Sequence, residues 1–171
     1  MARPEPTYTI EQLESEPVFD VPAFARDDAT RLGEIAVAVI REWDRNLAVD
    51  IHIGDELAYR AQLGTTGQRN ADVIQGKRLV AKKFGHSSLL ARLKKDADPS
   101  IADGLDDSYK FWGGCIPIFV NGDLVATITT SGEPDVVDHE AAAEAVRRYL
   151  GEVAQRHDFV GASAGHPLAK R

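Results

Sequence analysis

The chain has 171 residues, enough for one domain with a sizeable buried core. Its hydrophobic content of 43% and charged content of 27% are those of an ordinary soluble globular protein. No apolar run approaches the ~20 residues that a membrane-spanning helix needs, so we expect no membrane association. A formal net charge of −7, with scattered basic residues, argues against nucleic acid as a partner.

The cysteine content and the N-terminal residues bear on the cellular compartment. The single cysteine, Cys115, excludes an internal disulfide and fits a reducing environment. Residues 1–6 contain no apolar signal-peptide core, so we expect a cytoplasmic protein. One cysteine and five dispersed histidines form no structural zinc motif, and no metal site is predicted.

Residues 1–25 are predicted to form an N-terminal arm. Prolines at positions 4, 6, 17 and 22 disfavour long regular elements in this segment. Thr9 and Gln12 have capping-box spacing, which predicts a short helix over 10–14. We expect the remaining arm to lie over the domain or over a neighbouring subunit.

The following segment changes from helical to strand periodicity. Apolar residues at helical spacing, from Leu32 to Trp43, predict a helix over 28–45. Alternating apolar residues then predict two half-buried strands, 47–53 and 57–63, joined by a turn.

The middle of the chain is predicted to contain two helices. A long helix follows the loop 65–70, and Gly85 is predicted to end it as a C-cap. Ser87 or Ser88 caps a short helix that extends to Lys95. Residues 96–108 hold five aspartates and are expected to form an exposed acidic loop.

The clearest local pattern is a β-hairpin between Gly113 and Gly132. Asn121-Gly122 stands between two alternating apolar runs and favours a type I′ turn. A helix over 135–156 follows, and a Gly/Ala-rich tail covers 159–171. This order of elements predicts an α+β fold: an antiparallel sheet of four to five strands flanked by helices, in a domain spanning 26–158.

Two histidines are candidates for ligand binding. His86 follows the glycine helix end, and its imidazole could ligate haem iron or bind an anion together with Ser87 and Ser88. The alternative is that the serines only cap the short helix. His139 could bind an anion near a helix N-terminus, oriented by Asp138, but a surface position is favoured.

Further candidates come from the loops and the glycine-flanked hairpin. Arg69, Lys77 and Arg78 could bind a carboxylate, but Lys77 and Arg78 are more simply explained as a solvated helix face, and Arg69 is favoured. Asn70, next to Arg69 at the end of the loop, is a further candidate for ligand binding. Cys115 could be a reactive thiol, although a buried, inert cysteine is commoner. Ser131, Gly113 and Gly114 complete the candidate set, because glycines permit close approach of a backbone or ligand.

Several motifs together resemble a known family. They are Thr65-Thr66-Gly67 through Lys77-Arg78, Phe84-Gly85-His86-Ser87-Ser88, Gly113-Gly114-Cys115-Ile116-Pro117-Ile118, Ser131-Gly132 and Asp138-His139. Over roughly 10–157 the chain resembles the haem-degrading-domain superfamily of HbpS and GlcG proteins, and is most similar to its uncharacterised bacterial and fungal branch. The pattern differs at Cys115, where a small residue is common, and at Val73, where an aromatic residue is common.

The resemblance implies a profilin- or PAS-like sheet and assembly into homo-oligomers, with haem or iron bound by some members. We therefore expect a small-molecule binding module for haem or an anionic metabolite. Its pocket would lie between the loop 65–70, the turn 84–88 and the hairpin. The alternatives are an oligomeric structural or chaperone-like protein and a haem-degrading enzyme. A homo-oligomer built from dimers is expected, with the arm at a subunit contact.

Overall fold

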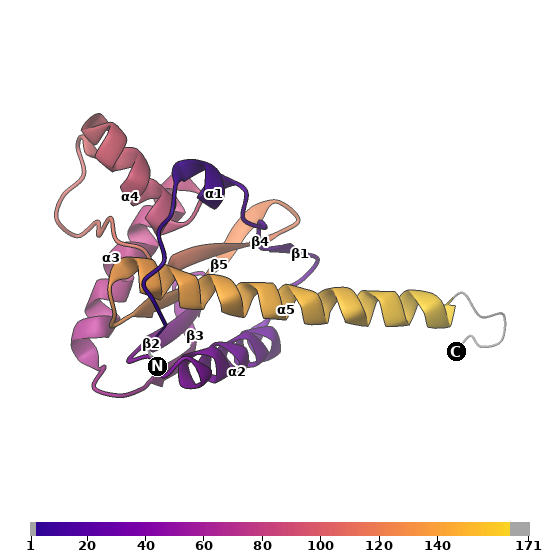
Figure 1. Ribbon diagram of the computed structural model, residues 1–171. Helices are drawn as coiled ribbons and strands as arrows, with labels where there is room; N and C mark the ends of the chain where they lie inside the picture. Colours follow the sequence, from indigo (N-terminus) through magenta and orange to yellow (C-terminus); the bar gives the residue numbers. More distant parts are fainter. Residues whose placement is uncertain (1–2, 165–171) are drawn as a thin grey trace.

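A five-stranded sheet forms the centre of the molecule (Figure 1). The computed structural model describes residues 3–164. The strands are β1 (Asp20–Val21), β2 (Ala48–Ile53), β3 (Glu56–Gln62), β4 (Cys115–Val120) and β5 (Asp123–Ser131). They lie in the order β1-β4-β5-β2-β3, so the two hairpins β2–β3 and β4–β5 are adjacent. This arrangement confirms the predicted α+β fold.

Helices cover both faces of this sheet. They are α1 (Ile10–Glu14), α2 (Arg26–Glu42), α3 (Gln68–Phe84), α4 (Ser88–Ala97) and α5 (Asp135–Ala164), with a 3-10 turn at Pro99–Ala102. The helices α2 and α5 pack together, and α3 packs against strands β2, β4 and β5. The tip of α5 extends well beyond the sheet (Figure 1).

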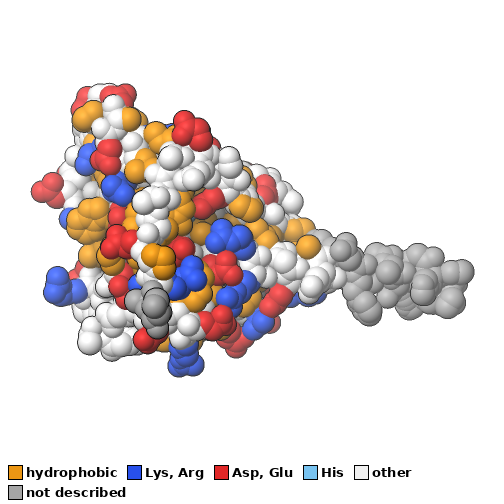
Figure 2. Space-filling model, in the orientation of Figure 1, with side chains coloured by type: hydrophobic (Ala, Val, Ile, Leu, Met, Phe, Trp, Pro, Cys, Tyr) orange, Lys and Arg blue, Asp and Glu red, His pale blue; other side chains and the backbone are white. Residues whose placement is uncertain are grey.

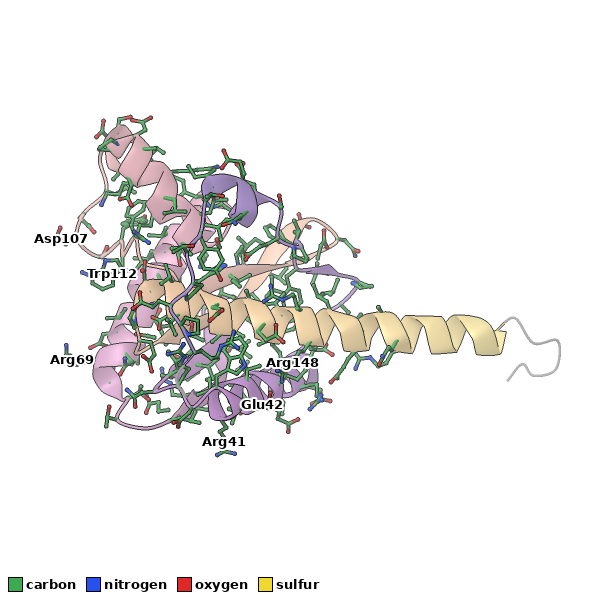
Figure 3. The ribbon with its side chains drawn as sticks, in the orientation of Figure 1. Arg41, Glu42, Arg69, Asp107, Trp112 and Arg148 are labelled. Carbon is green, nitrogen blue, oxygen red and sulfur yellow. The ribbon has the colours of Figure 1, made fainter. Side chains whose placement is uncertain are left out.

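The main hydrophobic core lies between the sheet and the pair α2–α5. Leu32 and Val39 of α2 meet Ile51 and Ile128 of the sheet, and all four are fully buried. Helical spacing of the apolar residues in α2 places them on one face, which explains why this face is buried. At the outer side of the helix pair, Arg148 donates two hydrogen bonds to the Glu42 carboxylate (Figure 3).

The arm packs onto the same domain and contributes an edge strand. Thr9 and Gln12 form the predicted capping box of α1. Phe19, Val21 and Phe24 are buried in the main core. Strand β1 pairs with β4 in parallel, so the expectation of a fully antiparallel sheet is wrong at this one edge. Strand β1 has only two residues, too few to show a periodic pattern in the sequence. The long connection between β1 and β4 permits their parallel pairing.

The predicted helix ends and turns agree well with the structure. Asn121 and Gly122 have φ values of 49° and 88°, as a type I′ turn requires. Gly85 has a φ of 73° and ends α3 in a left-handed cap. Helix α5 continues to Ala164, beyond the predicted end at 156, and the rest of the expected tail, 165–171, lies outside the described residues. Within the described part of the chain, no helix is both long and apolar enough to cross a membrane.

Candidate functional site

Five of the candidate residues line two separate hollows, one toward each end of α3. The groove beside its C-terminal end, here called the His86 groove, includes His86 and Ser87. The cleft beside its N-terminal end, here called the Lys77 cleft, consists of two adjoining cavities. The two hollows share no lining residue. The loop 65–70 and the turn 84–88 are joined by the seventeen residues of α3, a length of about 25 Å. The expectation of a single pocket is therefore wrong, because the loop 65–70 and the turn 84–88 lie at opposite ends of one helix.

The His86 groove is mainly apolar and has a volume of about 310 Å³. The arm forms one wall, while α4 and β4 form the other. Its lining residues are Leu13, Glu14, Glu16, Pro17, Val18, Phe19, Gly85, His86, Ser87, Leu90, Lys94, Ile116, Pro117 and Phe119. This composition suits a ligand with a large apolar surface and one polar edge.

Local hydrogen bonds orient the imidazole of His86. Nδ1 lies 3.0 Å from the carbonyl oxygen of Ser87, which can only accept a hydrogen bond. In the neutral ring Nδ1 therefore carries the proton, and Nε2 retains its lone pair. Burial lowers the pKa of His86, so the ring is neutral at pH 7. The ring also stacks on Phe84, with centroids 6.1 Å apart.

The two serines after His86 have structural contacts. Ser87 Oγ accepts a hydrogen bond from the backbone N–H of Leu90 and caps α4. Ser88 is fully buried, and its Oγ accepts from the backbone N–H of Cys115 at 3.0 Å. Ser87 lines the groove, whereas Ser88 joins α4 to the start of β4.

A buried ion pair forms part of the Lys77 cleft. Lys77 is 1% exposed, and its Nζ donates at 2.8 Å to the carbonyl oxygen of Thr130 and to Oδ2 of Asp138. Oδ1 of Asp138 accepts from the backbone N–H of Glu133. Burial raises the pKa of Asp138 to about 6, although the Lys77 ammonium opposes this effect. The prediction of a solvated helix face is wrong for Lys77, and also for Arg78, which is 5% exposed.

The cleft also brings together three of the predicted site residues. Its wall contains Asn70 and Ser131, and the Asn70 amide donates to Ser131 Oγ at 3.3 Å. Arg69 lines the adjoining cavity and is exposed. Figure 3 shows Arg69 and Trp112 on the same side of the molecule, both extending outward from the ribbon. Sequence reasoning missed Trp112, whose exposed side chain at the cleft follows no periodic pattern.

The glycine pair and Cys115 are buried and serve close packing. Gly114 has a φ of 135°, and a Cβ there would lie 2.5 Å from the Thr130 carbonyl oxygen and 2.8 Å from Lys77 Nζ. Gly113 donates its backbone N–H to Asp135. Cys115 is fully buried, and burial raises the pKa of its thiol to about 11. A thiol in this state carries very little thiolate at pH 7, which does not support the reactive-thiol hypothesis.

His139 lies inside the protein, so its expected surface position is wrong. Its ring is fully buried; Nε2 lies 2.9 Å from Oε1 of Glu16, and Tyr8 packs edge-on at 5.1 Å. The physical reason is that the arm crosses the first turns of α5 and covers this residue. His139 therefore fastens the arm to α5 and lines neither hollow. Sequence reasoning also missed Glu16, because its partner is 123 residues away.

The surface itself does not define a further site. Figure 2 shows acidic, basic and hydrophobic side chains interspersed over the face it presents. Among the residues that the structure describes, no group of three or more His, Cys, Asp or Glu side chains could hold a metal ion.

Comparison with known proteins supports the resemblance drawn from the motifs. The family model described as haem degrading protein HbpS-like matches residues 24–147. A UPF0303 protein of Streptomyces coelicolor is 34% identical over 134 residues, covering 75% of this chain and 85% of that protein. One from Burkholderia ambifaria is 36% identical over 137 residues, covering 77% and 82%.

Solved structures share the same fold. The crystal structure of Ybr137w protein has a TM-score of 0.75 and 28% identity, covering 85% of this chain and 90% of that chain. The crystal structure of a PduOC:haem complex has a TM-score of 0.61 and 16% identity, covering 73% and 94%. The chain therefore belongs to the haem degrading protein HbpS-like family.

Proposed function

We propose that this protein is a small-molecule binding module that holds haem in the His86 groove. The observation that carries the proposal is the state of His86: its Nδ1 is engaged by the Ser87 carbonyl, which leaves Nε2 as the free ligand atom. A neutral imidazole with a fixed tautomer is the form that coordinates iron. The lowered pKa of His86 supports this form at pH 7.

The residues around His86 fit an iron porphyrin. Apolar side chains from the arm, α4 and β4, among them Leu13, Leu90, Ile116 and Phe119, would contact the macrocycle. Lys94 lies at the groove and offers a cation to a propionate, although it also lies 3.6 Å from Glu14. A volume of about 310 Å³ is at the lower end for ligand pockets, so one edge of the porphyrin would remain at the mouth.

Family membership and the haem complex of a protein with the same fold support the choice of haem over other apolar ligands. The groove would exclude water from one side of the ligand and orient it through His86.

Titration with haemin, followed by visible spectroscopy, tests this proposal. We expect a saturable, shifted Soret band for the natural protein and at least a tenfold weaker affinity for His86→Ala, since one coordinating ligand is lost. Added imidazole should restore the spectrum of His86→Ala, because it can occupy the vacated position.

The matched control is Asn70→Ala, which alters the Lys77 cleft and should leave the haemin titration unchanged. Identical titrations for the natural protein and His86→Ala would contradict the proposal. Decay of the Soret band after addition of ascorbate would show that the bound haem is degraded, and would favour the haem-degrading alternative.

A further inference from the structure

The Lys77 cleft has a feature that packing alone does not explain. Lys77 carries three N–H donors, and two of them reach Thr130 and Asp138. No third acceptor lies within hydrogen-bond distance among the residues that the structure describes, although Lys77 is 99% buried and lines the cavity. A buried ammonium with an unused donor is costly, and an oxygen atom in the cavity would satisfy it.

The charges around this cavity almost cancel one another. Lys77 pairs with Asp138 at 2.8 Å, and Asp135 pairs with Arg92 at 2.7 Å. Glu133 remains as one negative charge, opposite in sign to Arg69 in the adjoining cavity and to Lys110, whose Nζ lies 5.5 Å from the centroid of the Trp112 ring. A ligand bearing a net charge would therefore meet a like charge at one side of the cleft, and an uncharged ligand would not.

The remaining walls favour a flat ligand. Trp112 is 46% exposed and lies at the cavity. Lys110 Nζ lies 5.5 Å from the centroid of its ring, and the rest of the exposed indole can contact a flat ligand. Val73 provides a second apolar surface, and the cavity has a volume of about 400 Å³. Ser131 Oγ accepts from Asn70, which leaves the serine hydroxyl hydrogen free to donate.

We propose that the Lys77 cleft is a second binding site, which takes a small planar molecule with an uncharged carbonyl or carboxamide oxygen. The oxygen accepts from Lys77 Nζ, and the planar body lies against Trp112. This site does not depend on the His86 groove, because the two hollows share no lining residue.

Three planar probes of similar size test the site: benzamide, benzoate and benzamidine, whose head groups are neutral, anionic and cationic at pH 7. Trp43→Phe leaves Trp112 as the single tryptophan, so its fluorescence reports on the cleft. We expect saturable quenching by benzamide and at least about fivefold weaker binding of both charged probes. Absence of saturation with benzamide up to about 10 mM, or equal binding of the charged probes, would overturn the proposal.

Two variants connect the binding to the named residues. Lys77→Met combined with Asp138→Asn removes the buried charges together, and it should weaken benzamide binding about tenfold while circular dichroism shows a folded protein. If this double variant does not fold, Trp112→Ala provides the test, because Trp112 is exposed and its replacement does not disturb the core. Calorimetry should then show an affinity for benzamide about fivefold lower than that of the natural protein.

Lys83→Gln is the matched control, because it removes an exposed positive charge of α3 that lines neither hollow. It should leave the affinity for benzamide within about twofold. The proposal would be contradicted if the affinity for benzamide were unchanged in both the Lys77→Met/Asp138→Asn variant and the Trp112→Ala variant. Benzamide would then bind elsewhere. Haemin titration of the same variants should remain unchanged, which separates this site from the proposed haem site.

Discussion

His52 is a buried histidine in a polar layer between the sheet and α3. It is 2% exposed, and Nε2 lies 3.4 Å from the Gln75 amide. Burial and the neighbouring Arg78 lower its pKa to about 4, with Asp50 and Asp55 acting in the opposite direction and Arg60 adding a smaller lowering effect. Charging this ring inside the protein therefore costs free energy.

We expect the stability of the protein to fall between pH 6.5 and 4 because of His52. The unfolded chain takes up the proton near pH 6.5, whereas the folded chain takes it up only near pH 4. The contribution of neutral His52 to the free energy of unfolding is thus fully present above pH 6.5. It is lost as the pH falls to 4, and the loss is about 3 kcal/mol at most. Urea denaturation at several pH values should show a smaller loss for His52→Gln than for the natural protein. Equal losses in the two proteins would contradict this assignment.

At the scale of elements, the hairpin β4–β5 contains two glycines with positive φ in different surroundings. Gly122 at the turn has a φ of 88° and open space around it. Gly114 at the start of the hairpin has a φ of 135° and contacts Thr130 and Lys77 too closely for a Cβ. Backbone strain acts at both positions, but steric overlap acts only at Gly114.

Alanine substitutions should separate these two effects. Gly122→Ala should destabilise the protein by about 1 kcal/mol, through backbone strain alone. Gly114→Ala should cost about 3 kcal/mol or more, because the hairpin must move away from Lys77 and Asp138. Denaturant unfolding followed by circular dichroism measures both values. Equal costs would show that Gly114 is not closely packed against the ion pair. Gly122→Val should be worse than Gly122→Ala, since a β-branched residue resists positive φ.

On the scale of the whole molecule, the arm is part of the domain's own core. Phe19, Val21 and Phe24 are buried within the chain, so they do not require a second subunit for their burial. Val18 remains 69% exposed, and among residues 3–164 no strand pairs with the outer edge of β3. An unpaired edge and exposed apolar residues are surfaces that association can cover.

We still expect a homo-oligomer built from dimers, with the arm at a contact. Deletion of the arm would remove core residues and destabilise the domain. Val18→Asp is therefore the better test of the contact, because it alters only the exposed surface. It should leave the melting temperature almost unchanged. Light scattering at micromolar concentration should give a multiple of 18.6 kDa for the natural chain and a smaller species for Val18→Asp. A monomeric natural protein would contradict the assembly, and unchanged association of Val18→Asp would exclude the arm from the contact.

Local patterns in the sequence determined most of the elements of this fold. The capping box at Thr9, the left-handed cap at Gly85 and the turn at Asn121-Gly122 each depend on residues close together in the chain, and each was predicted correctly. The helical spacing of Val73, Lys77 and Val80 also contained the signal that Lys77 faces inward. Lysine side chains are usually solvated, and the prediction of a solvated helix face followed this tendency rather than the spacing.

Only the tertiary structure decided which of these residues meet. Lys77 can be buried because Asp138, 61 residues away, supplies the opposing charge. His139 is buried because the arm crosses α5 and places Glu16 beside its ring. The parallel pairing of β1 and the division of the candidate residues between two hollows likewise depend on long-range contacts. Burial of a polar group is favourable only when a partner is present. The sequence shows the group, but the partner's position is a property of the folded chain.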